Sequence, residues 1–312
     1  MGTGRTVRDM QYVLLGLIGL LALVGGIVAG LALYSVRLLT RRRPPDAPAS
    51  PADHGLDYEI IAFSSRDDLT LRGWFIPAAL PRGTVIFCHG QAGSMDPDLE
   101  YAPVFYEKGY NVLMFDFRAH GRSDGTLVGM GSLEQLDLLG AVEWLGERGI
   151  DRVGVMGFSM GGRVAINTAP KTDAIVAVVS DGGPATLLEA VAAEFRKQRL
   201  SGFLARLVAR LTLWLAGRQV GCDLGEADAV HWVSQLSPRA LLLIHGGRDP
   251  YVSTESVRAL FAAAGEPKEL WIVPEAGHRQ ADNHCPDEYQ DRIIDFFDRH
   301  LAKDVGHNSR GK

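Results

Sequence analysis

Cysteine is scarce in this sequence. The 312 residues contain three cysteines, Cys88, Cys222 and Cys285, and no CxxC or HExxH pattern. An odd, irregularly spaced set argues against a disulfide scaffold, although it leaves open a bridge between one pair. The nearest group of metal-ligand residue types lies in GHRQADNHC and comprises His278, Asp282, His284 and Cys285. We predict no metal site there, because His278 has a different expected role.

An excess of charge of either sign is also lacking. The chain has 32 basic and 37 acidic residues, a formal net charge of −5 and 46% hydrophobic residues. This balance argues against a disordered chain and against a nucleic-acid-binding protein, which would carry a basic surplus. The length suits one large α/β domain or two small ones.

Charged residues are absent between Asp9 and Arg37. Residues 12–36 are almost wholly apolar, and this run exceeds the roughly 20 residues that a bilayer-spanning helix needs. A signal peptide has a shorter apolar core, of about 7–15 residues, and a small-residue cleavage site. We therefore predict a short tail over residues 1–11 and a retained transmembrane anchor over residues 12–36.

The basic residues that flank this span bear on its orientation. Four follow it and two precede it, namely Arg37, Arg41, Arg42 and Arg43 against Arg5 and Arg8. The positive-inside tendency then favours a single-pass membrane protein with its C-terminal domain in the cytoplasm. Export of the long domain behind a short basic N-terminus stays open as the alternative.

Beyond the span, the sequence divides into a tether, a folded domain and a tail. Residues 37–55 are basic and then rich in proline and alanine, which predicts a semi-extended tether. Residues 56–301 alternate short apolar runs with helical periodicities, and residues 302–312 form a polar tail.

The folded domain has the pattern of the α/β class. DYEIIAFSS and LTLRGWFIP predict a leading antiparallel hairpin. Six later runs, from GTVIFCHG to ELWIVPEAG, are continuously apolar, as buried parallel strands are. Strands that alternate with helices predict a doubly wound, mostly parallel sheet. Functional loops are then expected at the carboxyl ends of its strands.

A serine stands between a predicted strand and a predicted helix in VGVMGFSMGG. At such a sharp turn the serine backbone is strained, and the flanking positions must be nearly free of side chains. Gly157 and Gly161 meet that requirement. The turn lifts the hydroxyl above the sheet, so we predict that Ser159 is a nucleophile.

A serine hydroxyl needs a general base, and the base needs an orienting acid. We predict His278 as the base, because AGH lies just beyond the last predicted strand. Asp249, at the end of the preceding strand, is the predicted acid, and Asp181 in VVSDGGP is its competitor. Four other histidines fit the role of base less well: His89, His120, His245 and His284.

Residues 56–301 resemble an α/β-hydrolase-fold serine hydrolase of the lipase/esterase and serine-aminopeptidase-like branch. The matching stretches, in family order, are FCHGQAGS, DFRAHGRSDG, GFSMGG, HGGRDPYV and AGH. The placement of HGQAGS and RAHGRSDG is also similar to membrane-anchored members of the BEM-type group. The resemblance implies an oxyanion hole formed by the backbone N–H groups of Gln91 and Met160. It implies no metal and no organic cofactor.

These residues predict a serine hydrolase that cleaves carboxylic esters of a small molecule or a lipid. Amide or peptide hydrolysis and acyl transfer would use the same residues and stay open. Dehalogenases and epoxide hydrolases of this architecture carry an aspartate where Ser159 stands, which argues against both classes. An oxidoreductase is not expected either, because no GxGxxG follows the first predicted strand. A catalytically silent, membrane-tethered binding protein is the alternative of another class. The sequence leaves the oligomeric state open.

An insertion at about residues 183–237 is longer than a strand–helix–strand connection requires, and it predicts a cap over the site. Its segment 195–222 has basic residues but no acidic one. One helix side is expected to carry Phe203, Leu204, Leu207, Val208, Leu211, Trp214 and Leu215, and another side Arg206 and Arg210. The arginines exclude a second transmembrane span. Either the apolar side packs on the domain and the arginines are solvated, or it lines an acyl site while the arginines meet anionic lipid headgroups.

Overall fold

The computed structural model describes residues 3–302, and at its centre is one eight-stranded sheet. The strands are β1 (Glu59–Ser64), β2 (Thr70–Ile76), β3 (Gly83–Cys88), β4 (Tyr110–Phe115), β5 (Val153–Phe158), β6 (Ile175–Asp181), β7 (Ala240–Gly246) and β8 (Lys268–Val273). Their order across the sheet is β1-β2-β4-β3-β5-β6-β7-β8. β2 pairs antiparallel with β1 and β4, and all other neighbours pair in parallel. The predicted hairpin and the doubly wound, mostly parallel sheet are thus confirmed.

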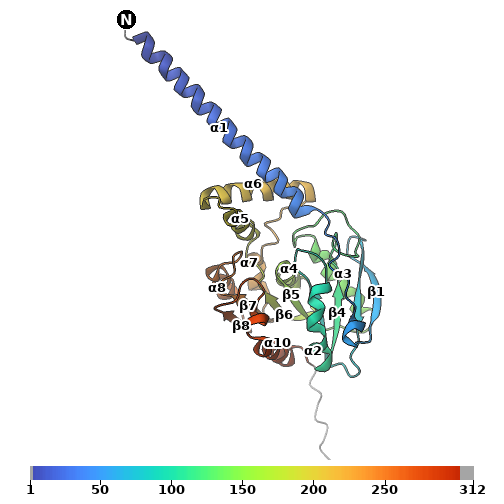
Figure 1. Cartoon of the computed structure of the whole chain (residues 1–312). Coiled ribbons are helices and arrows are strands. Elements are labelled where there is room, and N and C mark those ends of the chain that lie inside the picture. The colour runs from blue at the N-terminus through green and yellow to red at the C-terminus, as the bar shows by residue number, and fades with distance from the viewer. Residues whose placement is uncertain (1–2, 303–312) are drawn as a thin grey trace, which may run out of the picture.

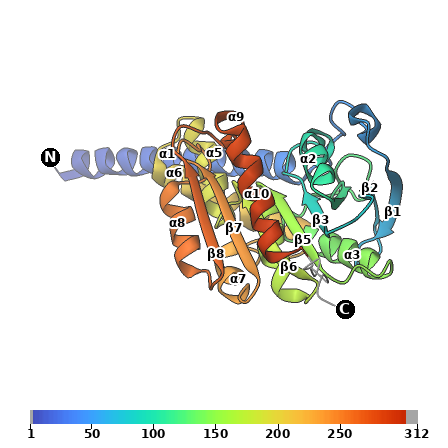
Figure 2. The ribbon, with the colours of Figure 1, turned by 90° about the horizontal axis from the view of Figure 1, so that it is seen from below.

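The sheet separates two apolar cores, because successive residues of a strand point to opposite faces. In β4, Leu113 belongs to one core and Met114 to the other. The helices of the first face are α3 (Glu134–Gly146), α4 (Met160–Thr168) and α8 (Thr254–Ala263), and those of the second are α2 (Ala102–Glu107) and α10 (Pro286–His300). Figure 2 shows α10 crossing the strands. Short helices complete the fold: η1 (Pro51–His54), η2 (Asp96–Tyr101), η3 (Ala169–Lys171), η4 (Val233–Gln235) and α9 (Ala281–His284).

The insertion between β6 and β7 forms a helical cap. Its helices are α5 (Leu187–Lys197), α6 (Gly202–Val220) and α7 (Ala229–Trp232). The hydroxyls of Thr186 and Ser201 accept backbone N–H groups in the first turns of α5 and α6. α6 ends at Val220 and is capped by Gly221, whose φ of 85° is a conformation that glycine adopts with little strain.

The face that α6 turns to the domain matches its apolar pattern only in part. Its buried residues are small or β-branched: Ala205, Val208, Ala209, Thr212 and Ala216. Phe203, Leu207 and Trp214 are 82%, 44% and 58% exposed, and they share the outer face with Arg206 and Arg210. The expected apolar side is therefore confirmed at Val208 and at the half-buried Leu204, Leu211 and Leu215, and it is wrong at Phe203, Leu207 and Trp214. Small side chains occupy the inner face because they let α6 approach α1 and α5 closely.

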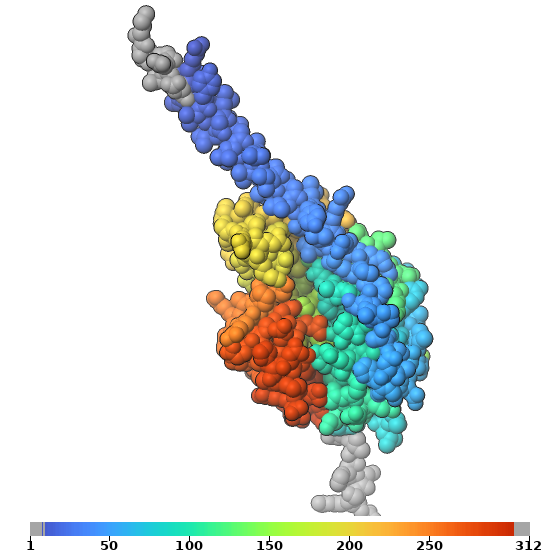
Figure 3. Space-filling model, in the orientation of Figure 1, coloured from blue at the N-terminus to red at the C-terminus, as the bar shows by residue number. Residues whose placement is uncertain are grey.

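The N-terminal helix α1 (Thr3–Thr40) projects far beyond the domain (Figure 1). One side of its last turns is buried at Val28, Ala32, Val36 and Thr40, and α1 packs there on α6. Figure 3 shows this end of α1 (blue) directly against the cap (yellow). Residues 10–40 form a helix long and apolar enough to cross a membrane, with a mean hydropathy of 2.6 in its most apolar window. A membrane span and a signal sequence both have these properties.

α1 extends into both of the flanking segments expected from the sequence. No proline interrupts residues 3–40, and the helix ends shortly before Pro44. The proline-rich segment that follows is bound to the domain: the N–H of Ser94 donates to Asp46 over 2.7 Å, and the N–H of Ala49 to Asp96 over 3.0 Å. α1 therefore has a fixed position relative to the domain. The polar tail expected over residues 302–312 lies, except for Ala302, outside the described residues.

Candidate active site

The serine of GFSMG occupies a sharp turn between β5 and α4. Ser159 has a φ of 51° and a ψ of −111°, which is strained for a residue with a Cβ atom. A Cβ at Gly157 would collide with the backbone of Gly161, and a Cβ at Gly161 would collide with the carbonyl group of Cys88. Close backbone approach therefore requires both glycines. The turn carries the Ser159 hydroxyl to the carboxyl end of β5.

The structure brings Ser159, His278 and Asp249 into one hydrogen-bonded chain. His278 Nε2 lies 2.9 Å from Ser159 Oγ, and His278 Nδ1 lies 2.6 Å from Asp249 Oδ2. Asp249 follows β7 and His278 follows β8, so adjacent parallel strands deliver both side chains to the same edge of the sheet. The Asp249 side chain is fully buried, whereas 21% of the His278 side chain is exposed.

The surroundings of Asp249 determine which atoms of Asp249 and His278 carry a proton. Burial alone would raise the pKa of Asp249, but the hydrogen bond from His278 and those from the N–H groups of Tyr251 and Val252 lower it below its usual value. Asp249 is thus an ionised acceptor, and His278 donates its Nδ1 proton to it. Nε2 then has a free lone pair toward the Ser159 hydroxyl. This geometry lets His278 take the hydroxyl proton.

Asp181, the competing acid, faces a different partner. Its carboxylate accepts a hydrogen bond from the Tyr289 hydroxyl over 2.9 Å. Burial raises the pKa of Asp181 to about 6. Its backbone carbonyl accepts the N–H of Ser159 over 2.8 Å. Asp181 therefore supports the serine turn, and Asp249 is the carboxylate beside His278.

Gln91 and Met160 both line the cavity next to Ser159. Met160 is the first residue of α4, where a backbone N–H has no partner within the helix. Within residues 3–302, the N–H groups of Gln91 and Met160 donate to no other backbone group. Both groups are therefore available to a ligand oxygen.

Two histidines that the sequence places in turns hold the loop that carries Gln91. His89 Nε2 accepts the N–H of Phe117 over 2.9 Å, and its Nδ1 lies 2.6 Å from the carbonyl oxygen of Gly90. Burial lowers the pKa of His89 well below its usual value, so the ring is neutral and Nδ1 carries the proton. His120 Nε2 lies 3.1 Å from the carbonyl oxygen of Gln91. The sequence places both histidines in HG turns, and this position could have indicated their structural role in the loop.

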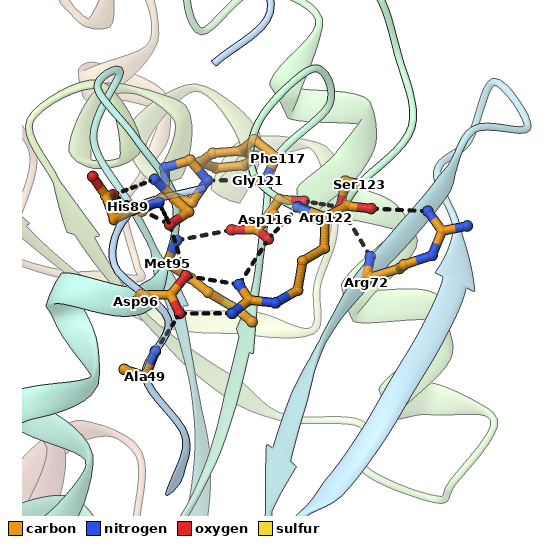
Figure 4. A network of polar contacts seen from close by, with 12 residues as sticks. Ala49, Arg72, His89, Met95, Asp96, Asp116, Phe117, Gly121, Arg122 and Ser123 are labelled. Carbon is orange, nitrogen blue, oxygen red and sulfur yellow. Dashed lines mark hydrogen bonds and ion pairs between the residues drawn. The ribbon is translucent and has the colours of Figure 1, made fainter. Parts of the chain in front are cut away.

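A polar network beneath this loop anchors the DFRAHGRSDG stretch (Figure 4). Both terminal nitrogens of Arg122 lie 2.7 Å from oxygens of Asp96. Asp116 accepts the backbone N–H groups of Met95 and Arg122, each over 2.8 Å. Asp96 also accepts the N–H of Ala49, in the segment after α1. The network therefore joins the region around Ser159 to the chain that leaves α1.

Ser159 and His278 line a cavity of about 590 Å³. The cap contributes residues of α5, among them Leu187, Ala190, Val191 and Phe195. α6 contributes none of the described lining residues, so the expectation that its apolar side lines an acyl site is wrong. α1 contributes Ser35, Leu38 and Leu39, which the sequence did not indicate.

The remaining candidates from the sequence have other partners. Asp282, of the group considered for a metal, accepts the Tyr101 hydroxyl over 2.6 Å. Cys88, Cys222 and Cys285 are free thiols. Arg279, which sequence reasoning missed, pairs with buried Asp98 and lies over the ring of Phe158 at 4.4 Å. It secures the backbone directly after His278.

Comparison with known proteins agrees with this architecture. The family model described as alpha/beta hydrolase fold matches residues 83–231. The chain has the α/β-hydrolase fold. The Pyrococcus furiosus esterase Pf2001 is 28% identical to this chain, with a TM-score of 0.70, over 83% of this chain and 100% of the esterase chain.

Relatives by sequence match a similar share of this chain. The Escherichia coli K12 protein YfhR is 28% identical over 251 residues, which are 77% of this chain and 80% of YfhR. The Schizosaccharomyces pombe protein bem46 is 26% identical and covers 80% of this chain and 79% of its own. The similarity therefore extends over most of both partners and includes the region of Ser159.

Proposed function

We propose that this α/β hydrolase is a membrane-anchored serine hydrolase that cleaves carboxylic esters through an acyl-enzyme on Ser159. One observation carries the proposal: the unbroken hydrogen-bonded chain from Ser159 through His278 to Asp249, at the wall of a largely apolar cavity. The likeness to an esterase that is 28% identical supports the reaction class.

The mechanism follows from the donors and acceptors in this chain. Ser159 Oγ attacks the ester carbonyl carbon while His278 Nε2 takes the hydroxyl proton. The bond to the leaving oxygen then breaks, and His278 returns the proton to the departing alcohol. A water molecule, deprotonated by the same nitrogen, attacks the acyl-enzyme; the bond from the acyl carbon to Ser159 Oγ breaks, His278 returns the proton to Oγ, and the carboxylic acid leaves. Asp249 stabilises the positively charged ring of His278 in both halves.

Gln91 and Met160 are the proposed donors to the developing oxyanion. Two backbone N–H groups held in place by the fold need no reorganisation when the negative charge forms. Such a donor typically stabilises the transition state by about 3–4 kcal/mol. The support is that both groups lack a backbone acceptor among the described residues and line the same cavity as Ser159.

Hydrolysis of an amide or peptide, and acyl transfer to an acceptor other than water, are the alternatives within enzymes. A catalytically silent binding protein is the alternative of another class. A fluorophosphonate probe distinguishes the last from the rest, because it reacts with an activated serine. We expect the wild-type chain to be labelled and to hydrolyse p-nitrophenyl butyrate, and Ser159→Ala to do neither. Ser64→Ala, at an exposed position of β1, is the matched control and retains both. Undiminished labelling of Ser159→Ala would refute the assignment.

We further propose that α1 spans a membrane and that the hydrolase domain lies in the cytoplasm. Arg37, Arg41 and Arg42 are exposed where α1 meets the domain, which suits the cytoplasmic side of a bilayer. Protease added to intact cells should leave the domain whole. Digestion of the domain by protease added outside the cells would show the opposite orientation.

We also propose that the outer face of α6 contacts lipid headgroups. Phe203, Leu207 and Trp214 are exposed on it together with arginines, a composition that suits the boundary between headgroups and acyl chains. Among the ion pairs of the described residues, none includes Arg206 or Arg210. They are therefore available to anionic headgroups.

A further inference from the structure

The polar end of α1 indicates where the bilayer surface would lie. Tyr34 is 63% exposed, and Arg37 is the first charged residue after the uncharged stretch. Tyrosine and arginine at the end of a span typically lie at the interface between lipid and water. In a membrane spanned by α1, the bilayer surface would lie at the level of these two residues, near the contact of α1 with α6.

The cavity of Ser159 begins at the same level. Ser35, Leu38 and Leu39 of α1 line it. Leu38 follows Tyr34 by four residues, about 6 Å along the helix axis. The α1 residues that line the cavity are therefore within about two helical turns of the level proposed for the bilayer surface.

Most of the side chains that α1 and α5 contribute to the cavity are apolar, and Ser35 and Glu194 are the polar ones. Six apolar residues of the cavity lining form what we call the α1–α5 wall: Leu38 and Leu39 of α1, and Leu187, Ala190, Val191 and Phe195 of α5. An acyl chain on this wall stays out of water during its transfer from the bilayer. The cavity, of about 590 Å³, has the size of sites that enclose small ligands.

α1 is also attached to the loop that would hold the oxyanion. Gln91 Nε2 donates a hydrogen bond to the carbonyl oxygen of Leu39 over 3.3 Å. The end of α1 thus contacts both the apolar wall and the loop beside Ser159. It has the position of a structural part of the site and not only of an anchor.

We propose that the substrate is a membrane-resident acyl lipid that enters the cavity from the bilayer leaflet facing the domain, with its acyl chain on the α1–α5 wall. This inference rests on the proposed ester hydrolysis and on α1 as a span. Ser159 bonds to the acyl carbon, the headgroup-bearing alcohol leaves with the proton from His278, and water releases the fatty acid.

The test uses the full chain in vesicles, with large side chains introduced on the α1–α5 wall to block the cavity. Leu38→Trp and Ala190→Trp fill it from α1 and from α5. Leu33→Trp is the matched control, because Leu33 is on α1 but exposed and outside the cavity lining. Each variant is assayed with a long-chain diacylglycerol embedded in the vesicles and with water-soluble p-nitrophenyl butyrate. Fluorophosphonate labelling reports whether Ser159 is still active.

The measured quantity is the ratio of the vesicle-ester rate to the soluble-ester rate. We expect each blocking variant to lower this ratio at least tenfold while it is still labelled, and Leu33→Trp to leave both rates unchanged. An unchanged ratio in labelled Leu38→Trp and Ala190→Trp would overturn the proposal, as would a wild-type chain that hydrolyses only the soluble ester. Failure of the ester hydrolase function itself would differ, because the wild type would then cleave neither ester and take no label.

Discussion

The side-chain amide of Gln91 donates a hydrogen bond to the carbonyl oxygen of Leu39 over 3.3 Å. This bond joins the last turns of the N-terminal helix to the loop beside Ser159. His120 Nε2 lies 3.1 Å from the backbone carbonyl oxygen of Gln91, so His120 also contacts this residue. The backbone N–H of Gln91 is thus positioned by two distant segments of the chain.

Loss of the bond to Leu39 should slow catalysis more than it weakens substrate binding. Gln91→Leu keeps the backbone N–H and a similar volume but cannot donate to the carbonyl group. One hydrogen bond is worth about 1 kcal/mol, which corresponds to about a fivefold decrease in kcat. Steady-state kinetics with p-nitrophenyl butyrate measure this, and Gln219→Leu on the exposed side of α6 is the control. A rise in KM at constant kcat would contradict a positioning role for Gln91.

The two candidate acids should differ sharply when each is converted to its amide. Asp249→Asn retains the shape of the side chain but removes the charge that fixes the His278 tautomer, so kcat should fall about 10³–10⁴-fold. Asp181→Asn can still accept a hydrogen bond from Tyr289 and should change kcat less than about threefold. The comparison requires both variants to fold, which circular dichroism checks. The opposite ranking would make Asp181 the catalytic acid.

The order of strands and helices was predictable because each parallel strand is buried on both sides and therefore reads as a continuous apolar run. The meeting of Ser159, Asp249 and His278 was predictable for a related reason, since residues just beyond parallel strands gather at one edge of the sheet. Neither inference required knowledge of distances between side chains. Both followed from local pattern and topology.

The face of α6 and the lining of the cavity could not be predicted in the same way. Large apolar residues normally indicate the packed side of a helix, yet here Ala205 and Ala209 face inward and Phe203 faces out. That choice depends on how closely α1 approaches, which is a tertiary property. The contribution of Leu38 to the cavity depends on the same packing, so the sequence showed α1 only as an anchor.

The buried carboxyl group of Asp181 should make stability depend on pH. Burial raises its pKa to about 6, against about 3.9 in an unfolded chain. Between these values the folded state binds more protons, so Asp181 lowers the free energy of unfolding as the pH rises from about 4 to about 6. The full effect is on the order of 3 kcal/mol. Thermal unfolding of the full chain in detergent at pH 4.5 and 6.5 should show a smaller decrease for Asp181→Asn than for the wild type. An equal decrease in both would exclude Asp181 as its source.

The proposed contact of α6 with lipid places Trp214 at the bilayer surface. Trp214 is 58% exposed, and the guanidinium of Arg218 lies 5.1 Å from its ring centre. Brominated lipids in proteoliposomes quench only tryptophans that they reach, so we expect the wild-type fluorescence to fall and Trp214→Phe to lose most of that quenching. Trp271→Phe, in β8 beneath Arg292, is the control and should keep it. Quenching that persists undiminished in Trp214→Phe would mean that the outer face of α6 stays in water, and its arginines would then be solvated and not bound to headgroups.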